Sequence, residues 1–136
     1  MKELEVVAAI IEYEDKILCM QRNVSKYTYT SLKFEFPGGK VEQGETNPQA
    51  LERELREEMD MYVHITDDDY FMTIHHEYPD FSITMHSYLV KVNKPDFIRK
   101  EHINHVWALP KDIKTLDWAA ADQPIVDKVM EHFNAI

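Results

Sequence analysis

The chain has 136 residues, of which 44% are hydrophobic, so it is large enough for one domain with a substantial core and has the composition of a soluble globular protein. Its net charge of −10 argues against a nucleic-acid polymer as partner, because lysine and arginine must replace the counterions of a phosphate backbone. The single cysteine, Cys19, leaves no internal disulfide and favours a reducing, cytoplasmic location.

Strands are predicted where apolar and β-branched residues run or alternate between turn residues. The apolar run from Val6 to Ile11 is too short to span a bilayer, and no basic leader or cleavage site accompanies it. We therefore expect a buried strand and no membrane partner. In chain order, the predicted strands and extended segments are 5–13, 17–21, 34–36, 62–65, 71–78, 81–92 and 102–109. Residues 23–31, polar and mixed with tyrosines, are predicted to form a loop.

Two longer helices and one short helical turn are predicted between and after these strands. Thr46 and Gln49 form a capping-box pattern with Pro48 in the first turn, which predicts a helix that runs to about Asp60. Residues 110–113 are predicted as a helical turn and 124–133 as an amphipathic helix. Strands that alternate with helices indicate an α/β fold with a mixed sheet, and residues 1–136 are predicted to form a single domain.

The predicted helix after Thr46 carries a concentration of acidic side chains. At 3.6 residues per turn, Glu54, Glu57 and Glu58 fall within an arc of roughly 100°. Three carboxylates so close repel one another unless a cation lies among them, which indicates a divalent-metal site. A solvated helix face is the alternative, in which Arg53–Glu57 is an ordinary surface ion pair.

The spacing around these acids resembles the Nudix box. Gly39 is followed by Glu45 and then by Arg53-Glu54-Leu55-x-Glu57-Glu58-x-Asp60-Met61, over twenty-three residues. The similarity extends to residues 5–11, 34–40 and 117–124 and is greatest with MutT-like enzymes and their CTP-hydrolysing relatives. The one departure is Asp60, where the box normally has a glycine that suits a left-handed helix terminus; aspartate tolerates that conformation at a cost of about 1 kcal/mol.

The resemblance implies the Nudix fold, with a mixed sheet between helices (α/β/α), and a metal-dependent pyrophosphohydrolase. Such enzymes direct water to a phosphorus atom and, in the MutT-like branch, release a nucleoside monophosphate and pyrophosphate. Arg53 would orient Glu54, and Glu45 would be mainly structural. The implied ligands of Mg²⁺, or of Mn²⁺ in its place, are Glu54, Glu57, Glu58, Glu101 and the Gly39 carbonyl.

The general base is predicted to be Glu54 or Glu101. Phosphoanhydride cleavage requires neutralised phosphate charge and an oriented water, for which clustered carboxylates and Mg²⁺ are suited. Glu101 lies six residues before Trp107, where MutT-like sequences place a further metal-binding or base carboxylate. A plain surface position in a charged loop is its alternative.

Three residues are predicted to bind substrate: Arg22, Tyr78 and Asp122. By similarity, Arg22 turns toward the nucleotide and Asp122 accepts from the N4 amino group of cytosine. The aromatic ring of Tyr78 is suited to stacking on the base. A carboxylate can equally accept from guanine N1 and N2. The structural alternatives are a surface arginine, a core tyrosine and an N-cap for the last helix.

The leading hypothesis is a Mg²⁺-dependent hydrolase of free nucleoside triphosphates that clears CTP or modified dCTP from the nucleotide pool. An 8-oxo-dGTP diphosphatase is the first alternative, followed by a hydrolase of dinucleoside polyphosphates or nucleotide sugars. A non-catalytic nucleotide- or protein-binding module is ranked last, because Glu54, Glu57 and Glu58 are all present. The protein is expected to be a monomer or a small homo-oligomer.

Overall fold

The computed structural model describes residues 2–134. Its helices are α1 (Asn47–Met59) and α2 (Gln123–His132), and its 3₁₀ turns are η1 (Asp67–Asp69), η2 (Pro110–Thr115) and η3 (Ala120–Asp122). Its strands are β1 (Lys2–Tyr13), β2 (Lys16–Gln21), β3 (Phe34–Glu35), β4 (Gly38–Lys40), β5 (Tyr70–Glu77), β6 (Phe81–Lys91) and β7 (Asn104–Ala108).

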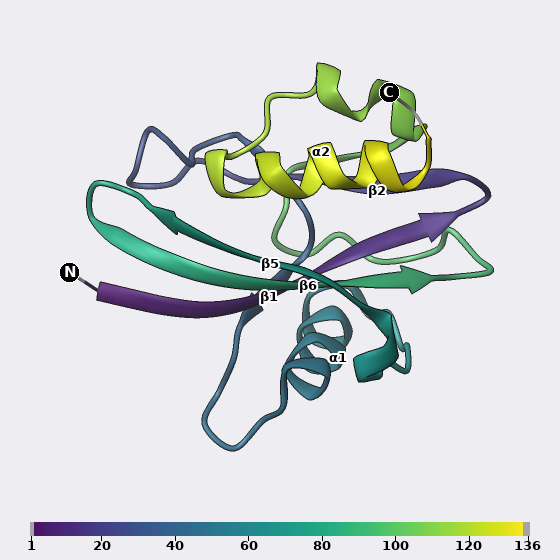
Figure 1. Cartoon of the computed structure of the whole chain (residues 1–136), viewed down its shortest axis with the longest axis horizontal. Coiled ribbons are helices and arrows are strands. Elements are labelled where there is room, and N and C mark those ends of the chain that lie inside the picture. The colour runs from purple at the N-terminus through teal and green to yellow at the C-terminus, as the bar shows by residue number, and fades with distance from the viewer. Residues whose placement is uncertain (1, 135–136) are drawn as a thin grey trace.

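Within residues 2–134 the strands form one seven-stranded sheet ordered β3-β2-β1-β6-β5, with β4 paired to β1 and β7 paired to β2. The central pair, β1 and β6, is parallel. The remaining pairs are antiparallel, so the sheet is mixed, as predicted. Helix α1 covers one face of the sheet and α2 covers the other (Figure 1). The α/β/α arrangement is thereby confirmed.

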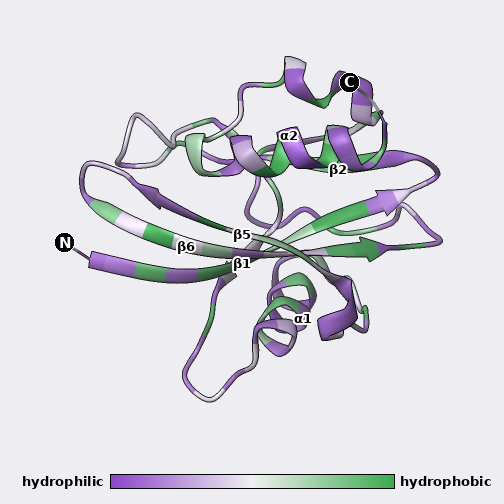
Figure 2. Ribbon diagram, viewed as in Figure 1, coloured by the Kyte–Doolittle hydropathy of each residue, from purple (hydrophilic) through white to green (hydrophobic). Residues whose placement is uncertain are grey.

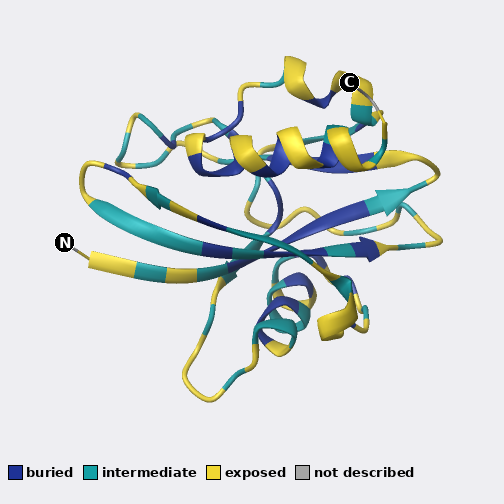
Figure 3. Ribbon diagram, in the orientation of Figure 1, coloured by how far each residue is buried: buried dark blue, intermediate teal, exposed yellow. Residues whose placement is uncertain are grey.

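Strand β1 contributes to the core on both faces of the sheet. Successive side chains of a strand point to opposite faces, so Ala8 and Ile10 join the core under α2, whereas Val7, Ala9 and Ile11 join the core under α1. Both helices turn their apolar, buried stripes toward the sheet (Figures 2 and 3). This two-sided burial explains why the strand reads as a continuous apolar run.

The ends of α1 follow the sequence closely. The hydroxyl of Thr46 accepts from the Gln49 amide, and the Gln49 side chain accepts from the Thr46 amide, so the predicted capping box is confirmed. At the other end, Asp60 adopts the left-handed conformation, with φ 50° and ψ 32°. Its amide donates to the carbonyls of Leu55 and Arg56, which closes the helix.

Two segments differ from the prediction. Strand β4 was not expected beyond Pro37; it forms because the Pro37 carbonyl accepts from the Ala9 amide and Gly38 then lies directly against β1. A Cβ at Gly38 would overlap the Val7 carbonyl, so only glycine permits this approach. Residues 62–65, predicted as extended, belong to no strand of the sheet. No helix in residues 2–134 is both long and apolar enough to cross a membrane.

Candidate active site

The glycine turn and helix α1 meet at Glu54. Strand β4 hydrogen-bonds to β1 and packs beside α1, which brings the Gly39 backbone against the Glu54 carboxyl group. A Cβ at Gly39 would overlap that carboxyl group. Glycine is therefore required at this position, because any side chain would occupy the space of the Glu54 carboxyl group.

Three of the predicted acids form an acidic cluster, defined here as Glu54, Glu58 and Glu101. Glu54 and Glu58 come from α1, whereas Glu101 comes from the irregular segment between β6 and β7. Burial, together with hydrogen bonding and charge repulsion from Glu54 and Glu101, raises the pKa of Glu58 to about 9. A protonated Glu58 can donate a hydrogen bond to either neighbour. The cluster thus concentrates negative charge in a partly desolvated place.

The chemistry of this donor set fits a hard divalent cation. The acidic cluster and the adjacent Gly39 backbone offer oxygen donors, which Mg²⁺ and Mn²⁺ prefer. In residues 2–134, no three His, Cys, Asp or Glu side chains already surround one point at ligand distances. The side chains therefore provide oxygen ligands for a metal, but they are not arranged as a complete coordination shell.

Glu57 lies apart from the acidic cluster. Its side chain is 55% exposed, and its Oε2 atom is 3.4 Å from Nη1 of Arg53. The structure therefore places Glu57 at the rim of α1, in the surface ion pair that was the alternative interpretation of the sequence. Its predicted metal role requires the side chain to turn toward Glu58.

Arg53 connects the elements around the acids. Its Nε and Nη2 atoms donate to both oxygens of Glu45, at 2.6 and 3.0 Å, and Nη2 also donates to the Lys40 carbonyl at 3.0 Å. Its Nη1 atom donates to Glu54 Oε1 at 3.0 Å, the contact expected of a residue that orients Glu54. We call these four residues the Arg53 network; it fastens the glycine turn to the helix that carries the acids.

Glu45 has the surroundings of a structural residue. Besides Arg53, it accepts from the Glu42 amide at 2.9 Å, which closes the turn before α1. The hydrogen bonds from Arg53 and from the Glu42 amide hold the pKa of Glu45 below its ordinary value. Glu45 is therefore an ionised anchor for Arg53 and is absent from the cleft described next.

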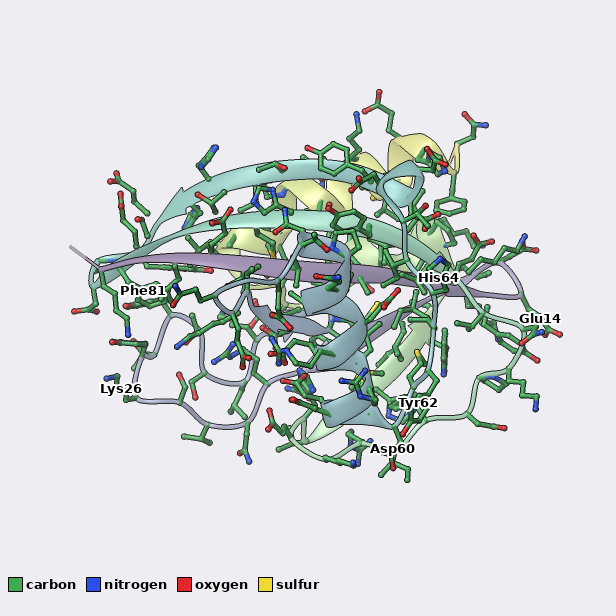
Figure 4. The ribbon with its side chains drawn as sticks, turned by 90° about the horizontal axis from the view of Figure 1, so that it is seen from below. Glu14, Lys26, Asp60, Tyr62, His64 and Phe81 are labelled. Carbon is green, nitrogen blue, oxygen red and sulfur yellow. The ribbon has the colours of Figure 1, made fainter. Side chains whose placement is uncertain are left out.

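A single cleft of about 920 Å³ joins the acidic cluster to the three predicted substrate-binding residues. Gly39 and the acidic cluster line this cleft together with Arg22, Tyr78 and Asp122. We call the part lined by Gly39 and the acidic cluster the acidic end. Residues from the loop 23–31 form another wall. Lys26 of this loop and Phe81 lie on one side of the molecule, away from Asp60 at the end of α1 (Figure 4).

Asp122 is a buried acid in this cleft, only 5% exposed. Its Oδ1 atom accepts from the Phe36 amide at 3.2 Å. Asp122 stands at the N-cap position of α2, as the structural alternative had it, but its side chain makes no capping hydrogen bond. Burial raises the pKa of Asp122 well above its ordinary value, and the charge of Glu35 adds to that effect.

Tyr78 is 6% exposed, and its ring stacks on Tyr29 at 5.0 Å between centroids. Tyr29 stacks in turn on Tyr27 at 5.2 Å and donates from its hydroxyl to Asp80 at 2.6 Å. We call Tyr27, Tyr29 and Tyr78 the aromatic stack. The Tyr78 hydroxyl accepts from the Ala121 amide at 3.0 Å, directly before Asp122. Since Tyr29 engages one face of Tyr78, the ring supports the cleft wall as well as lining it.

Sequence reasoning missed four residues near the cleft. Tyr27 and Tyr29 lie in a segment that was predicted as a polar loop. Their spacing of two positions was the one feature of that segment that indicated packing of the rings. Glu35 accepts from Arg22 Nη1 at 3.0 Å and lies 2.9 Å from Nε2 of the half-buried His102. Glu35 thus connects Arg22 with the residue that follows Glu101. An acid next to the predicted glycine turn was the only signal for it.

Comparisons with known proteins agree with this geometry. A family described as NUDIX domain matches residues 6–128. CTP pyrophosphohydrolase of Escherichia coli (strain K12) is 38% identical over 134 residues, covering 96% of this chain and 93% of the relative. 8-oxo-dGTP diphosphatase of the same organism is 33% identical over 131 residues, covering 95% and 98%. The solution structure of the E. coli ORF135 protein has a TM-score of 0.83 at 36% identity, covering 99% of this chain and 94% of that chain.

Proposed function

Because this chain belongs to the NUDIX domain family and is a Nudix pyrophosphohydrolase, we propose that it hydrolyses free nucleoside triphosphates, with CTP or a modified dCTP preferred. The products are a nucleoside monophosphate and pyrophosphate. The observation that carries this proposal is the cleft that the acidic cluster and a buried carboxylate, Asp122, both line. A triphosphate with its base extended spans these two chemical environments.

The acidic end holds the phosphates. Mg²⁺, or Mn²⁺ in its place, would neutralise phosphate charge there and orient the scissile anhydride. The residues that would hold it are Gly39, Glu54, Glu57, Glu58 and Glu101.

The proton of the attacking water passes to a carboxylate in this part of the cleft. Glu54 and Glu101 are the two candidates, since both lie beside Glu58. Arg53 keeps the Glu54 carboxyl group in one orientation through its Nη1 hydrogen bond and is itself held by Glu45. As the new oxygen–phosphorus bond forms, the bond to the pyrophosphate oxygen breaks and the base retains the proton of water.

Asp122 selects the base. Its Oδ1 atom is engaged by the Phe36 amide, so Oδ2 remains for a donor from the substrate. The exocyclic N4 amino group of cytosine is such a donor. Arg22, whose guanidinium is held by Glu35, lines the same part of the cleft and faces the nucleotide, while Tyr78 contacts the base from the wall.

A panel of nucleoside triphosphates incubated with Mg²⁺ tests the activity. Chromatography of the products should show monophosphate plus pyrophosphate, with the highest kcat/KM for CTP or 5-methyl-dCTP. Release of orthophosphate would contradict the proposal. The Glu58→Gln variant serves as the inactive control.

A second candidate, 8-oxo-dGTP hydrolysis, is favoured by the relative that is 33% identical over nearly the whole chain. The same carboxylate at Asp122 could accept from N1 and N2 of a guanine. Relative kcat/KM values for CTP and 8-oxo-dGTP decide between them; a tenfold or larger preference for 8-oxo-dGTP would reverse our order.

The net charge of the chain and the state of its one thiol bear on its location and its partners. We propose that residues 1–136 form one domain that acts in the cytoplasm on small molecules, as a monomer or small homo-oligomer. The net charge of −10 disfavours nucleic-acid polymers. The lone Cys19 is buried, and burial raises the pKa of its thiol to about 12, which leaves it unreactive. Light scattering and cell fractionation test the assembly and the location.

A further inference from the structure

Glu101 lies in the segment 92–103, which has no helix or regular strand of its own between β6 and β7. Yet Glu101 must lie within reach of Glu58. The segment is held from both sides by main-chain hydrogen bonds: the Ile98 amide donates to the Met59 carbonyl at 2.9 Å, and the Ile103 amide donates to the Gln21 carbonyl at 3.1 Å. Between these anchors, the side chain of Lys100 ties the segment to the end of α1.

That contact is an ion pair between Asp60 and Lys100. Lys100 Nζ is 2.9 Å from Asp60 Oδ1, and each side chain is 41% exposed. The same ammonium donates to the Glu57 carbonyl at 3.3 Å, one of the last carbonyls of α1. A cation at this position also favours the negative end of the helix dipole. Lys100 therefore binds the end of the helix by charge and by hydrogen bond.

The pair explains the departure of this chain from the box pattern. A glycine at position 60 would adopt the left-handed conformation without strain but would offer nothing to Lys100. The aspartate accepts the strained φ of 50° and presents a carboxylate to the residue directly before Glu101. Neither Asp60 nor Lys100 lines the cleft, so neither is placed to touch substrate.

We propose that Asp60 and Lys100 form a clamp that positions Glu101 against the acids of α1. The clamp joins the helix that carries Glu54 and Glu58 to the neighbour of Glu101. The assignment of Glu101 to metal binding or base catalysis rests on the proposed function, whereas the clamp itself is a property of the chain. Both residues are positioning residues.

Amide hydrogen exchange of the metal-free protein tests the clamp directly. In Asp60→Gly and in Lys100→Met, the Ile98 amide should exchange about fivefold faster, the size expected for loss of one exposed ion pair. The Val92 amide, which donates to the Glu12 carbonyl, should be unchanged and is the internal reference. The thermal midpoint of Asp60→Gly should equal or exceed that of the parent, because glycine relieves the left-handed strain.

Two further measurements report on Glu101. Without nucleotide, the dissociation constant for Mn²⁺ measured by electron paramagnetic resonance should rise about fivefold in both variants. With CTP and Mg²⁺, kcat should fall about fivefold while KM stays within about twofold of the parent. Lys100→Arg keeps the charge and the hydrogen bond and should restore all three readouts. The double variant should lose no more than either single one.

Lys114→Met is the matched control. Lys114 forms an ion pair of equal length, 2.9 Å, with Asp127 at a place remote from the cleft, so its loss should leave all three readouts unchanged. The clamp is refuted if Ile98 exchange in Asp60→Gly equals that of the parent, or if exchange quickens while Mn²⁺ affinity and kcat stay the same. A parent inactive on every triphosphate refutes the proposed function alone, since exchange and Mn²⁺ affinity then still decide on the clamp.

Discussion

The two ends of the cleft place their carboxylates by opposite means. At the acidic end, a charge positions the acids: the Arg53 guanidinium makes four hydrogen bonds, of which one goes to Glu54, two to Glu45 and one to the Lys40 carbonyl. At the other end, Asp122 is enclosed by apolar and aromatic side chains and has one main-chain donor, the Phe36 amide. Burial raises the pKa of an acid in both places, that of Glu58 in the first and that of Asp122 in the second, but a guanidinium contact supports only the first. The first arrangement suits chemistry on phosphate, and the second suits discrimination of a base.

Glu58→Gln should have the largest effect, because it removes a central donor from the acidic cluster while keeping the side-chain shape. We expect kcat/KM for CTP to fall about 10³-fold, the loss typical of one preorganised electrostatic contact. Circular dichroism should show a thermal midpoint near that of the parent. Residual activity within tenfold of the parent would mean that the acidic end is not where chemistry occurs.

Arg53→Ala should affect both activity and folding, since the guanidinium is 14% exposed and serves Glu45, Glu54 and Lys40 together. Loss of these charged hydrogen bonds is expected to lower the free energy of unfolding by about 2 kcal/mol and kcat/KM by about 10²-fold. Urea denaturation and steady-state kinetics measure the two effects. A stable, fully active variant would show that Glu54 keeps its orientation without Arg53.

Asp122→Asn should act on selectivity more than on turnover. An amide in place of the carboxylate changes which base edge is accepted, so the ratio of kcat/KM for CTP over 8-oxo-dGTP should shift by about 10- to 100-fold. The panel of triphosphates measures the ratio in parent and variant. An unchanged ratio would remove Asp122 from base recognition.

Asp122 also gives stability a predictable dependence on pH. Its pKa in the folded protein lies well above the ordinary 3.8. At pH values between 3.8 and the folded pKa, the folded state therefore holds a proton that the unfolded chain releases. Glu35 opposes the Asp122 charge, while Arg22 and the Phe36 amide favour it. This residue therefore stabilises the fold as pH falls through its folded pKa, and its contribution is lost as pH rises. Thermal midpoints of Asp122→Asn measured against pH should lack that component.

Tyr29→Leu should have the smallest effect. It removes the middle ring of the aromatic stack and the hydroxyl that donates to Asp80. Aromatic pairs of this kind contribute about 0.5–1.5 kcal/mol, so KM should rise a few-fold with kcat retained. Steady-state kinetics on CTP tests this, with Tyr62→Leu, an exposed tyrosine outside the cleft, as the control.

The acidic end could be predicted from sequence because most of it is local. Glu54 and Glu58 share one helix, and the capping box of Thr46 and Gln49 sets where that helix begins. The spacing of these residues in the sequence therefore gives their relative positions on the helix. Glu57 shares that helix, but its side chain pairs with Arg53 at the rim, so helix periodicity alone does not define its rotamer.

At the other end, individual residues could be predicted from the sequence, but the contacts between them could not. Asp122 meets the Phe36 amide across 86 positions, and Tyr29 meets Tyr78 across a loop that no periodicity describes. Asp60 and Lys100 are likewise 40 positions apart. Contacts of this kind depend on how the sheet brings distant segments together, which a pattern within a short window does not encode.

The parallel pairing of β1 with β6 has a consequence for biosynthesis. Residues 2–12 pair with residues 81–91, so the central strand leaves the ribosome long before its neighbour exists. Until then β1 can pair only with β2 and β4, and the edge that β6 will cover stays open; such delayed, non-local pairing folds slowly and exposes apolar surface. The nascent chain therefore passes through an interval in which chaperone capture competes with misassembly, and this interval lasts until residues 81–91 have been synthesised.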